Sequence, residues 1–274
     1  MHTINNLIIL KVGGSVLVDE NVRKQFTTDI LTLLDLKQKM VIVHGGGPFI
    51  EKRFEKLQIP TEKLDGYRIT PTPHLKVIEE VLFNEVHRQF TSDLKDKGVP
   101  IVSFDTPVKL PVTASPIFRF KRHDLGFVGE LKSVDQTAFK RWTDSSLIPV
   151  LASMACDETG QVYNINADTM ASALAGHLSA KLLIYATDTD GVYKDIKDSK
   201  SRIRKMNTGQ ALDLIENGSL SAGMIPKIES CIDALNTGTQ RVIIINGKNK
   251  DALLKAFLFS LDEGTHLYQE GERL

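Results

Sequence analysis

The sequence predicts an α/β protein built around a parallel β-sheet. Three short runs, residues 7–10, 41–43 and 182–186, are almost entirely apolar, which is typical of strands buried on both faces. Between the first two runs, residues 21–37 carry apolar side chains close to the helical period of 3.6. A strand, a helix and a second strand, with glycines at the end of each strand, begin a βαβ unit, whose two strands run parallel.

The rest of the chain continues this alternation. Helices are predicted over residues 49–57, 75–97, 171–178, 209–217, 228–236 and 252–259. Strands are predicted over residues 100–104, 147–152, 182–187, 203–206, 241–247 and 264–268. Residues 106–118 are proline-rich and predict a loop or irregular β-structure, whereas 118–134 predict a β-hairpin region. The apolar stripe along 75–97 predicts packing against the core, with a dimer face as the alternative.

The amino-acid composition indicates which kinds of binding partner and which cellular compartment to expect. The 274 residues include 34 Lys and Arg and 34 Asp and Glu, so no net charge favours nucleic acid or an anionic membrane as the main partner. Cys156 and Cys231 lack metal-binding spacing and are too few for a disulfide framework, which fits a reducing compartment. The N-terminal residues do not resemble a signal peptide, and no apolar run approaches the roughly 20 residues of a membrane span. We therefore expect a soluble, cytoplasmic protein.

Two glycine-rich turns follow the first two predicted strands. His44-Gly45-Gly46-Gly47-Pro48 ends the second strand, and Lys11-Val12-Gly13-Gly14 ends the first. Glycines let a ligand approach backbone N–H groups closely, and open parallel sheets bind ligands beyond the carboxyl ends of their strands. The spacing is neither that of a P-loop nor GxGxxG. The alternatives are tight turns without a ligand and a solvated Lys11.

Polar residues at three further positions are candidates for binding. Arg68 lies in an extended, proline-bounded segment and suits carboxylate or phosphate recognition, with a surface arginine as the alternative. Residues 164–168 lead into a helix, so they form either a polar pocket floor or a helix N-cap at Asp168 or Thr169. Lys227 lies near a helix N-terminus, where the dipole disfavours a cation unless an anion is nearby.

Six motifs in order resemble those of the amino acid kinase family, and together they extend over nearly the whole chain. They are Ile-Leu-Lys-Val-Gly-Gly at 9–14, His-Gly-Gly-Gly-Pro at 44–48, Gly-Tyr-Arg-Ile-Thr at 66–70, Asn-Ile-Asn-Ala-Asp at 164–168, Gly-Met-Ile-Pro-Lys at 223–227 and Gly-Thr at 264–265. The resemblance implies a three-layer α/β/α sandwich around a largely parallel eight-stranded sheet. It implies one domain, with an acyl-amino-acid-binding and dimerisation lobe at 1–178 and an ATP-binding lobe at 179–274.

The resemblance also implies an activity, which is phosphorylation by ATP of the side-chain carboxylate of an acyl amino acid. N-acetyl-L-glutamate, in arginine biosynthesis, is the expected substrate. Lys11 and Lys227 would approach the transferring phosphoryl group, and Asp168 would hold both ammonium groups. The implied substrate-binding residues are Gly46 and Gly47, through their N–H groups, Arg68, on the α-carboxylate, and Asn164. The implied nucleotide-binding residues are Gly13, Gly14, Asp188, Gly191, Gly223 and Met224. Mg²⁺ would be held mainly by the ATP phosphates, without a protein metal site.

The match departs from the family pattern in the substrate lobe. Residues 83–88 replace the usual Gly-x-Val-Asn-Lys, and the Gly-rich segment expected after the next strand is absent at 103–107. N-succinylglutamate is therefore an alternative substrate, and a non-catalytic nucleotide or arginine sensor is an alternative function. Because the first strand begins by Leu7, we expect a homodimer without the N-terminal helix that links hexameric relatives. His44 is expected to be a packed strand-end residue, because an ionised carboxylate needs no general base.

Overall fold

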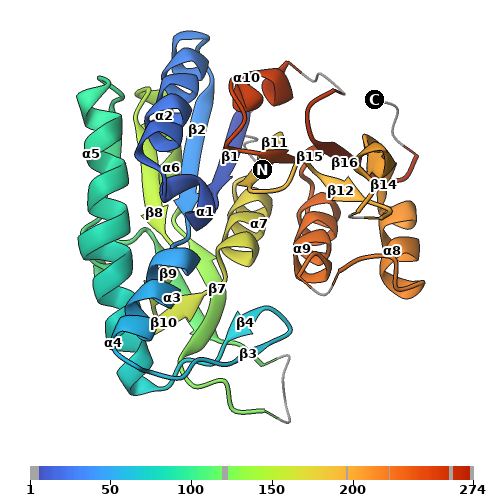
Figure 1. Ribbon diagram of the computed structural model, residues 1–274. Helices are drawn as coiled ribbons and strands as arrows, with labels where there is room; N and C mark the ends of the chain where they lie inside the picture. Colours follow the sequence, from blue (N-terminus) through green and yellow to red (C-terminus); the bar gives the residue numbers. More distant parts are fainter. Residues whose placement is uncertain (1–5, 119–122, 196, 222, 259–261, 272–274) are drawn as a thin grey trace.

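The computed structural model describes residues 6–118, 123–195, 197–221, 223–258 and 262–271, and it has the predicted α/β architecture (Figure 1). Every neighbouring pair in the main sheet is parallel except β15 and β16, so a largely parallel sheet is confirmed. Its eight strands lie in the order β14 (Lys205–Asn207), β16 (Thr265–Tyr268), β15 (Arg241–Asn246), β11 (Leu182–Thr187), β1 (Leu7–Val12), β2 (Lys39–His44), β8 (Ile148–Ala152) and β5 (Ile101–Ser103).

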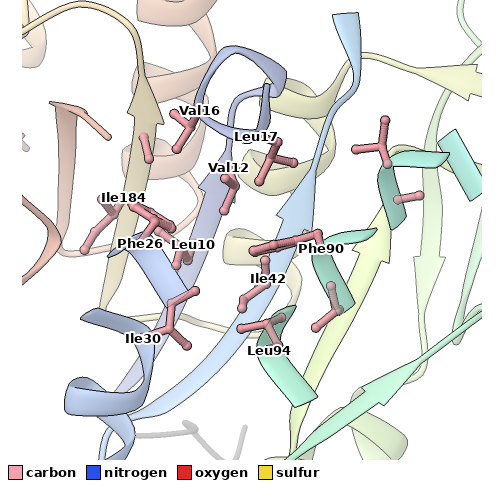
Figure 2. Close-up of a cluster of buried hydrophobic side chains, with 14 of the residues drawn as sticks. Leu10, Val12, Val16, Leu17, Phe26, Ile30, Ile42, Phe90, Leu94 and Ile184 are labelled. Carbon is pink, nitrogen blue, oxygen red and sulfur yellow. The ribbon is translucent and has the colours of Figure 1, made fainter. Parts of the chain in front are cut away.

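Helices cover both faces of this sheet and make it the middle of three layers. The odd-numbered residues Leu7 and Ile9 of β1 join a buried cluster with α7 (Ala167–His177) and α9 (Ile225–Asn236). The even-numbered residues of β1 pack on the opposite face, against α2 (Glu20–Asp35), α5 (Arg88–Asp96) and α10 (Ala252–Phe257). Figure 2 shows Leu10 and Val12 on that second face, beside side chains of the covering helices. The central strands are mostly apolar because both of their faces are buried.

Smaller sheets lie at the carboxyl end of the main one. A four-stranded sheet has the order β6 (Val112–Pro116), β7 (Val128–Val134), β10 (Val162–Ile165) and β9 (Met154–Cys156). The predicted hairpin region pairs through β7 with β6, which lies in the stretch predicted as loop or irregular β-structure. Residues 119–122 of that region lie outside the described residues. Two-stranded ribbons are formed by β3 (Lys63–Leu64) with β4 (Tyr67–Arg68), and by β12 (Val192–Tyr193) with β13 (Arg202–Ile203).

The predicted long helix at 75–97 is a continuous helical segment with a π-helical turn in its middle. It consists of α4 (Thr72–Glu80), a π-turn over Val81–His87, and α5. The apolar stripe is buried within the chain, including Ile78, Leu82 and Phe90 at 0% exposure. Core packing is therefore confirmed as the role of this stripe. The π-turn was not predicted, because a local widening of the helix leaves little trace in a 3.6-residue pattern.

The helices that follow glycine- or asparagine-capped turns begin close to their predicted positions, as in α3 (Gly47–Lys56) and α8 (Thr208–Glu216). Two helices were missed, namely the four-residue α1 (Gly14–Leu17) and α6 (Gln136–Asp144). A signal for α6 does exist, since the Asp135 carboxylate caps it by accepting from Ala138 N–H at 3.0 Å. Among the described residues, no helix is both long enough and apolar enough to cross a membrane.

Candidate active site

A cleft of about 400 Å³ opens at the carboxyl ends of β1 and β2. Nine of the predicted site residues line it, namely Lys11, Gly13, Gly14, Gly46, Gly47, Arg68, Asn164, Asp168 and Asp188. Lys227 is joined to the cleft through its ion pair with Asp168. Gly191, Gly223 and Met224 are not among the lining residues, so their nucleotide contacts stay a prediction. The placement follows from the parallel sheet, which brings the ends of adjacent strands to one edge.

Three charged side chains from three elements meet in this cleft. The Lys11 ammonium lies 2.8 Å from Asp168 Oδ1, and the Lys227 ammonium lies 2.6 Å from Asp168 Oδ2. The three side chains are only 10%, 17% and 11% exposed, for Lys11, Asp168 and Lys227. Burial alone would raise the pKa of the Asp168 carboxyl, but the two ammonium groups outweigh it and hold that pKa well below its usual value. Burial lowers the pKa of Lys11, although its attraction to Asp168 opposes the shift.

The start of α7 explains why the Asp168 carboxylate is free to pair with lysines. Asn166 is the N-cap, and its Oδ1 accepts from the N–H groups of Asp168 at 2.8 Å and Thr169 at 3.4 Å. The alternative in which Asp168 or Thr169 caps the helix is therefore wrong, because the cap is Asn166, two residues before Asp168 and three before Thr169. Asp168 instead stands in the first turn, where the helix dipole favours a negative charge.

The start of α9 shows how a lysine is tolerated near a helix N-terminus. Lys227 follows Pro226 in the first turn, and Met224, at the N-cap position, supplies no side-chain cap. The unfavourable dipole is offset by Asp168, which supplies the nearby anion that the sequence led us to expect. The two lysines are thus brought together from β1 and α9 by one carboxylate on α7.

Tyr185 supports this cluster, and the sequence did not single it out. It lies opposite Lys11 in the pairing of β1 with β11, and its hydroxyl donates to the backbone oxygen of Asp168 at 3.1 Å. The Lys227 ammonium lies 5.3 Å from the centroid of its ring, within the range of a cation–π interaction. Burial raises the pKa of Tyr185 well above its usual value, so the phenol remains a donor. The sequence does contain a signal for this role, because Tyr185 is an aromatic residue with a polar hydroxyl group in a strand of mostly aliphatic residues.

The glycines of the two turns allow the turns to pack closely. A Cβ atom on Gly14 would lie 2.8 Å from Pro48 Cδ and 3.0 Å from Gly47 N, and one on Gly46 would lie 2.6 Å from Leu82 Cδ2. Gly46 is the N-cap of α3 and Gly47 its first residue. The N–H groups of a first helical turn have no intrahelical acceptor, so this end of α3 suits an anion. The triple glycine forms a tight turn into α3, and binding of an anion by its N–H groups stays a prediction.

Arg68 is buried at the wall of the cleft, so the surface alternative is wrong. The residue is 8% exposed, its Nη2 donates to Glu51 Oε1 at 3.2 Å, and its guanidinium lies 5.5 Å from the Phe54 ring centroid. Its buried Nη1 has no hydrogen-bond partner within the described parts of the chain. Lys63, on the same hairpin, also donates to Glu51 Oε1, at 2.6 Å. Sequence reasoning missed both Glu51 and Lys63, because charged residues flanking a turn resemble a solvated surface.

The remaining predicted residues occupy the edges of the site. Asn164 Nδ2 donates to Thr70 Oγ1 at 3.0 Å, so its side chain is fixed between β10 and the end of the hairpin. Asp188 accepts from Thr187 Oγ1 at 3.2 Å at the end of β11. Gly191 has a φ of +133°, and a Cβ atom there would lie 2.5 Å from Thr265 Oγ1, which gives this glycine a packing role. The described residues contain no group of three or more His, Cys, Asp or Glu able to hold a metal ion.

Comparison with known sequences gives one consistent set of relatives. A model of the amino acid kinase family matches residues 6–246. Acetylglutamate kinase of Nitrobacter winogradskyi is 37% identical over 271 residues, covering 96% of this chain and 90% of the relative. The same enzyme of a Synechocystis strain is 34% identical, covering 98% and 90%, and the chloroplastic enzyme of Arabidopsis thaliana is 34% identical, covering 94% and 74%.

Solved structures share the fold. The structure of smu.665 from Streptococcus mutans has a TM-score of 0.77 at 29% identity, covering 87% of this chain and 94% of the other. N-acetylglutamate synthase from Neisseria gonorrhoeae has a TM-score of 0.85 at 22% identity, covering 97% and 60%. Carbamate kinase from Giardia lamblia has a TM-score of 0.71 at 15% identity, covering 98% and 100%. At these lower identities the likeness establishes the three-layer fold alone.

Proposed function

This chain belongs to the amino acid kinase family, and we propose that it transfers the γ-phosphoryl group of ATP to the side-chain carboxylate of N-acetyl-L-glutamate. The product is the acyl phosphate N-acetylglutamyl phosphate, an intermediate of arginine biosynthesis. The observation that carries the proposal is the cluster of Lys11, Asp168 and Lys227 beside the glycine turns. It occurs in a chain 34% to 38% identical to acetylglutamate kinases over nearly its full length.

The chemistry needs positioning and charge neutralisation more than covalent catalysis by the protein. The substrate carboxylate is ionised at neutral pH, so one of its oxygens attacks the γ-phosphorus while the bond to the ADP oxygen breaks. Lys11 and Lys227 offset the negative charge that spreads over the phosphoryl oxygens in the transition state. Asp168 fixes the separation of the two ammonium groups. The N–H groups of Gly46 and Gly47 add hydrogen bonds to the reacting oxygens.

The nucleotide enters as its magnesium complex. We expect the ion to be held mainly by the ATP phosphates, as is common for Mg²⁺. Asp188, directly after β11, is a carboxylate of the cleft that interacts electrostatically with Lys11. Together with Gly13 and Gly14 it forms the proposed wall for the phosphates.

The proposal also covers the division of the chain into two parts, its oligomeric state and its location in the cell. We assign substrate binding to residues 1–178 and ATP binding to residues 179–274, because Arg68 and Asn164 belong to the first part and Lys227 to the second. Dimerisation through residues 1–178 is an expectation from the family resemblance alone. A homodimer is tested by light scattering, in which a hexamer would contradict it. A cytoplasmic location is supported by Cys156 and Cys231, which are both buried and free.

A second substrate, N-succinyl-L-glutamate, is favoured by one observation. Lys63 lines the cleft as a cation additional to Arg68, and a second carboxylate on the acyl group would suit it. A purely sensing role is disfavoured by the complete cluster of Lys11, Asp168 and Lys227.

Assay of the purified chain with MgATP and a panel of acceptors tests the proposal. The acceptors are N-acetyl-L-glutamate, N-succinyl-L-glutamate, L-glutamate and N-acetyl-L-aspartate, with release of ADP and trapping of the acyl phosphate by hydroxylamine as readouts. We expect the highest kcat/KM for N-acetyl-L-glutamate. Preference for the succinyl compound would replace the acetyl assignment, and absence of hydroxamate with every acceptor would remove the kinase assignment.

Arg68→Ala is expected to raise the KM for the acyl amino acid by at least about tenfold, which corresponds to about 1.4 kcal/mol. The guanidinium is buried and its Nη1 is unpartnered among the described residues, so it is available to the substrate α-carboxylate. The KM for ATP should remain unchanged. Arg204→Ala is the matched control, because that side chain is 60% exposed and pairs with Asp262. An unchanged KM for the acyl amino acid in Arg68→Ala would remove Arg68 from this role.

A further inference from the structure

We propose that His87 is a positioning residue, which acts through His44 to point the N–H group of Gly46 into the catalytic cleft. This inference deepens the proposed function and rests on it, because the N–H group is assigned there to the reacting oxygens. His87 is the last residue of the π-turn, and His44 is the last residue of β2, directly before the triple glycine. Neither imidazole has a role in the phosphoryl-transfer step itself.

The two imidazoles form a buried pair. His44 Nε2 and His87 Nδ1 are 2.8 Å apart, the ring centroids are 5.1 Å apart, and the rings are stacked at 27°. The residues are 0% and 1% exposed. Phe90 packs edge-on to His44, and Phe83 is tilted against His87. This apolar enclosure explains why burial lowers the pKa of His44 to about 3 and that of His87 to about 4, so both rings are neutral at pH 7.

The hydrogen-bond partners decide which nitrogen of each neutral ring carries the proton. His44 Nδ1 lies 3.3 Å from the carbonyl oxygen of Gly45, so Nδ1 carries the proton and donates it. Nε2 of His44 is then an acceptor, and His87 Nδ1–H donates to it. The buried Nε2 of His87, which has no partner among the described residues, is left as a bare lone pair.

The opposite pair of tautomers leaves two conflicts. It would place the lone pair of His44 Nδ1 against the oxygen of Gly45, and it would leave an N–H group on His87 Nε2 buried without an acceptor. A continuous chain of donors therefore runs from His87 through His44 to the Gly45 carbonyl.

These hydrogen bonds determine the direction in which the N–H group of Gly46 points. In a trans peptide the C=O and N–H groups point in opposite directions, and the described residues contain no cis peptide bond. A Gly45 oxygen held towards His44 therefore turns the Gly46 N–H group away from it, to the side where Gly45 and Gly46 line the cleft. The same π-turn also limits the position of Gly46, since a Cβ atom there would lie 2.6 Å from Leu82 and 3.3 Å from Val86.

Kinetics of three variants test the proposal in the full-length chain. His87→Leu removes the donor and is expected to lower kcat by about tenfold, with the KM for ATP changed by less than about twofold, because the hydrogen bond matters most in the transition state. His87→Asn keeps an N–H donor on the same Cγ position and should recover most of kcat. Val81→Ala, a buried residue of the same π-turn without a hydrogen bond to His44, controls for lost stability. Equal kcat in His87→Leu and wild type would overturn the proposal, and so would equal losses in His87→Leu and Val81→Ala.

A spectroscopic measurement tests the tautomers even where a variant fails to fold. Nitrogen-15 spectra of histidine-labelled wild-type protein, with the ring signals assigned through bonds to the backbone, should show both rings protonated on Nδ1 at pH 7. Protonation of His44 on Nε2 would overturn the proposal, because the Gly45 carbonyl would then have no donor. This result does not depend on activity, so it separates failure of the positioning role from failure of the proposed kinase function.

Discussion

Replacing Lys11 or Lys227 by alanine is expected to lower kcat by at least about a hundredfold, which corresponds to about 2.7 kcal/mol of lost transition-state stabilisation. Each ammonium group is nearly buried, and each is held within hydrogen-bonding distance of Asp168 at the edge of the cleft. Charge in such a water-poor site interacts strongly with the developing charge on the phosphoryl oxygens. Initial rates at saturating ATP and acyl amino acid provide the measurement.

Two controls separate this effect from a general loss of positive charge. Lys24→Ala removes an exposed lysine that pairs with Glu20 in α2, and its kcat should equal that of the wild type. Lys11→Arg and Lys227→Arg keep the charge but not the compact ammonium group, so partial activity is expected. Turnover of either alanine variant within about twofold of the wild type would remove that lysine from the catalytic assignment.

Asp168→Asn is expected to lower kcat as strongly as loss of a lysine, although both ammonium groups remain. Without the carboxylate, the two buried cations repel each other and lose the partner that fixes their separation. Helix α7 should survive, because its cap is Asn166. Wild-type turnover in Asp168→Asn would return Asp168 to a purely structural role, and circular dichroism checks that the helix content is unchanged.

The same variant should change how stability depends on pH. The pKa of Asp168 is depressed in the folded state, so its contribution is fully present above the unfolded value of about 4 and is lost as pH falls through the folded value. At pH 7, Asp168→Asn should lower the free energy of unfolding by about 3 kcal/mol, measured by urea denaturation. The difference from wild type should shrink as the pH is lowered below about 4. A difference that is independent of pH would contradict the assigned cause.

Local composition was enough to predict the central strands and the edge at which the site lies. β1, β2, β11 and β15 are mostly apolar because helices cover both faces, with polar residues near their ends, and that burial is visible in the residues themselves. Lys11 is the clearest case, because a charged residue late in an otherwise buried strand must lie near its carboxyl end. The glycines after β1 and β2 predicted an approach of a ligand to their N–H groups, which stays a prediction, and the structure shows that Gly14 and Gly46 also lack room for a side chain.

The sequence by itself therefore determined the α/β class, the parallel core and several side chains of the cleft, since burial and glycine turns are local properties. Only the tertiary structure decided which of those side chains meet. Asp168 reaches Lys227 across 59 residues of sequence, and Glu51 reaches Arg68 across 17. The buried pair of His44 and His87 joins residues 43 positions apart. Such contacts depend on the order of strands in the sheet and on the π-turn, neither of which has a periodic signature in the sequence.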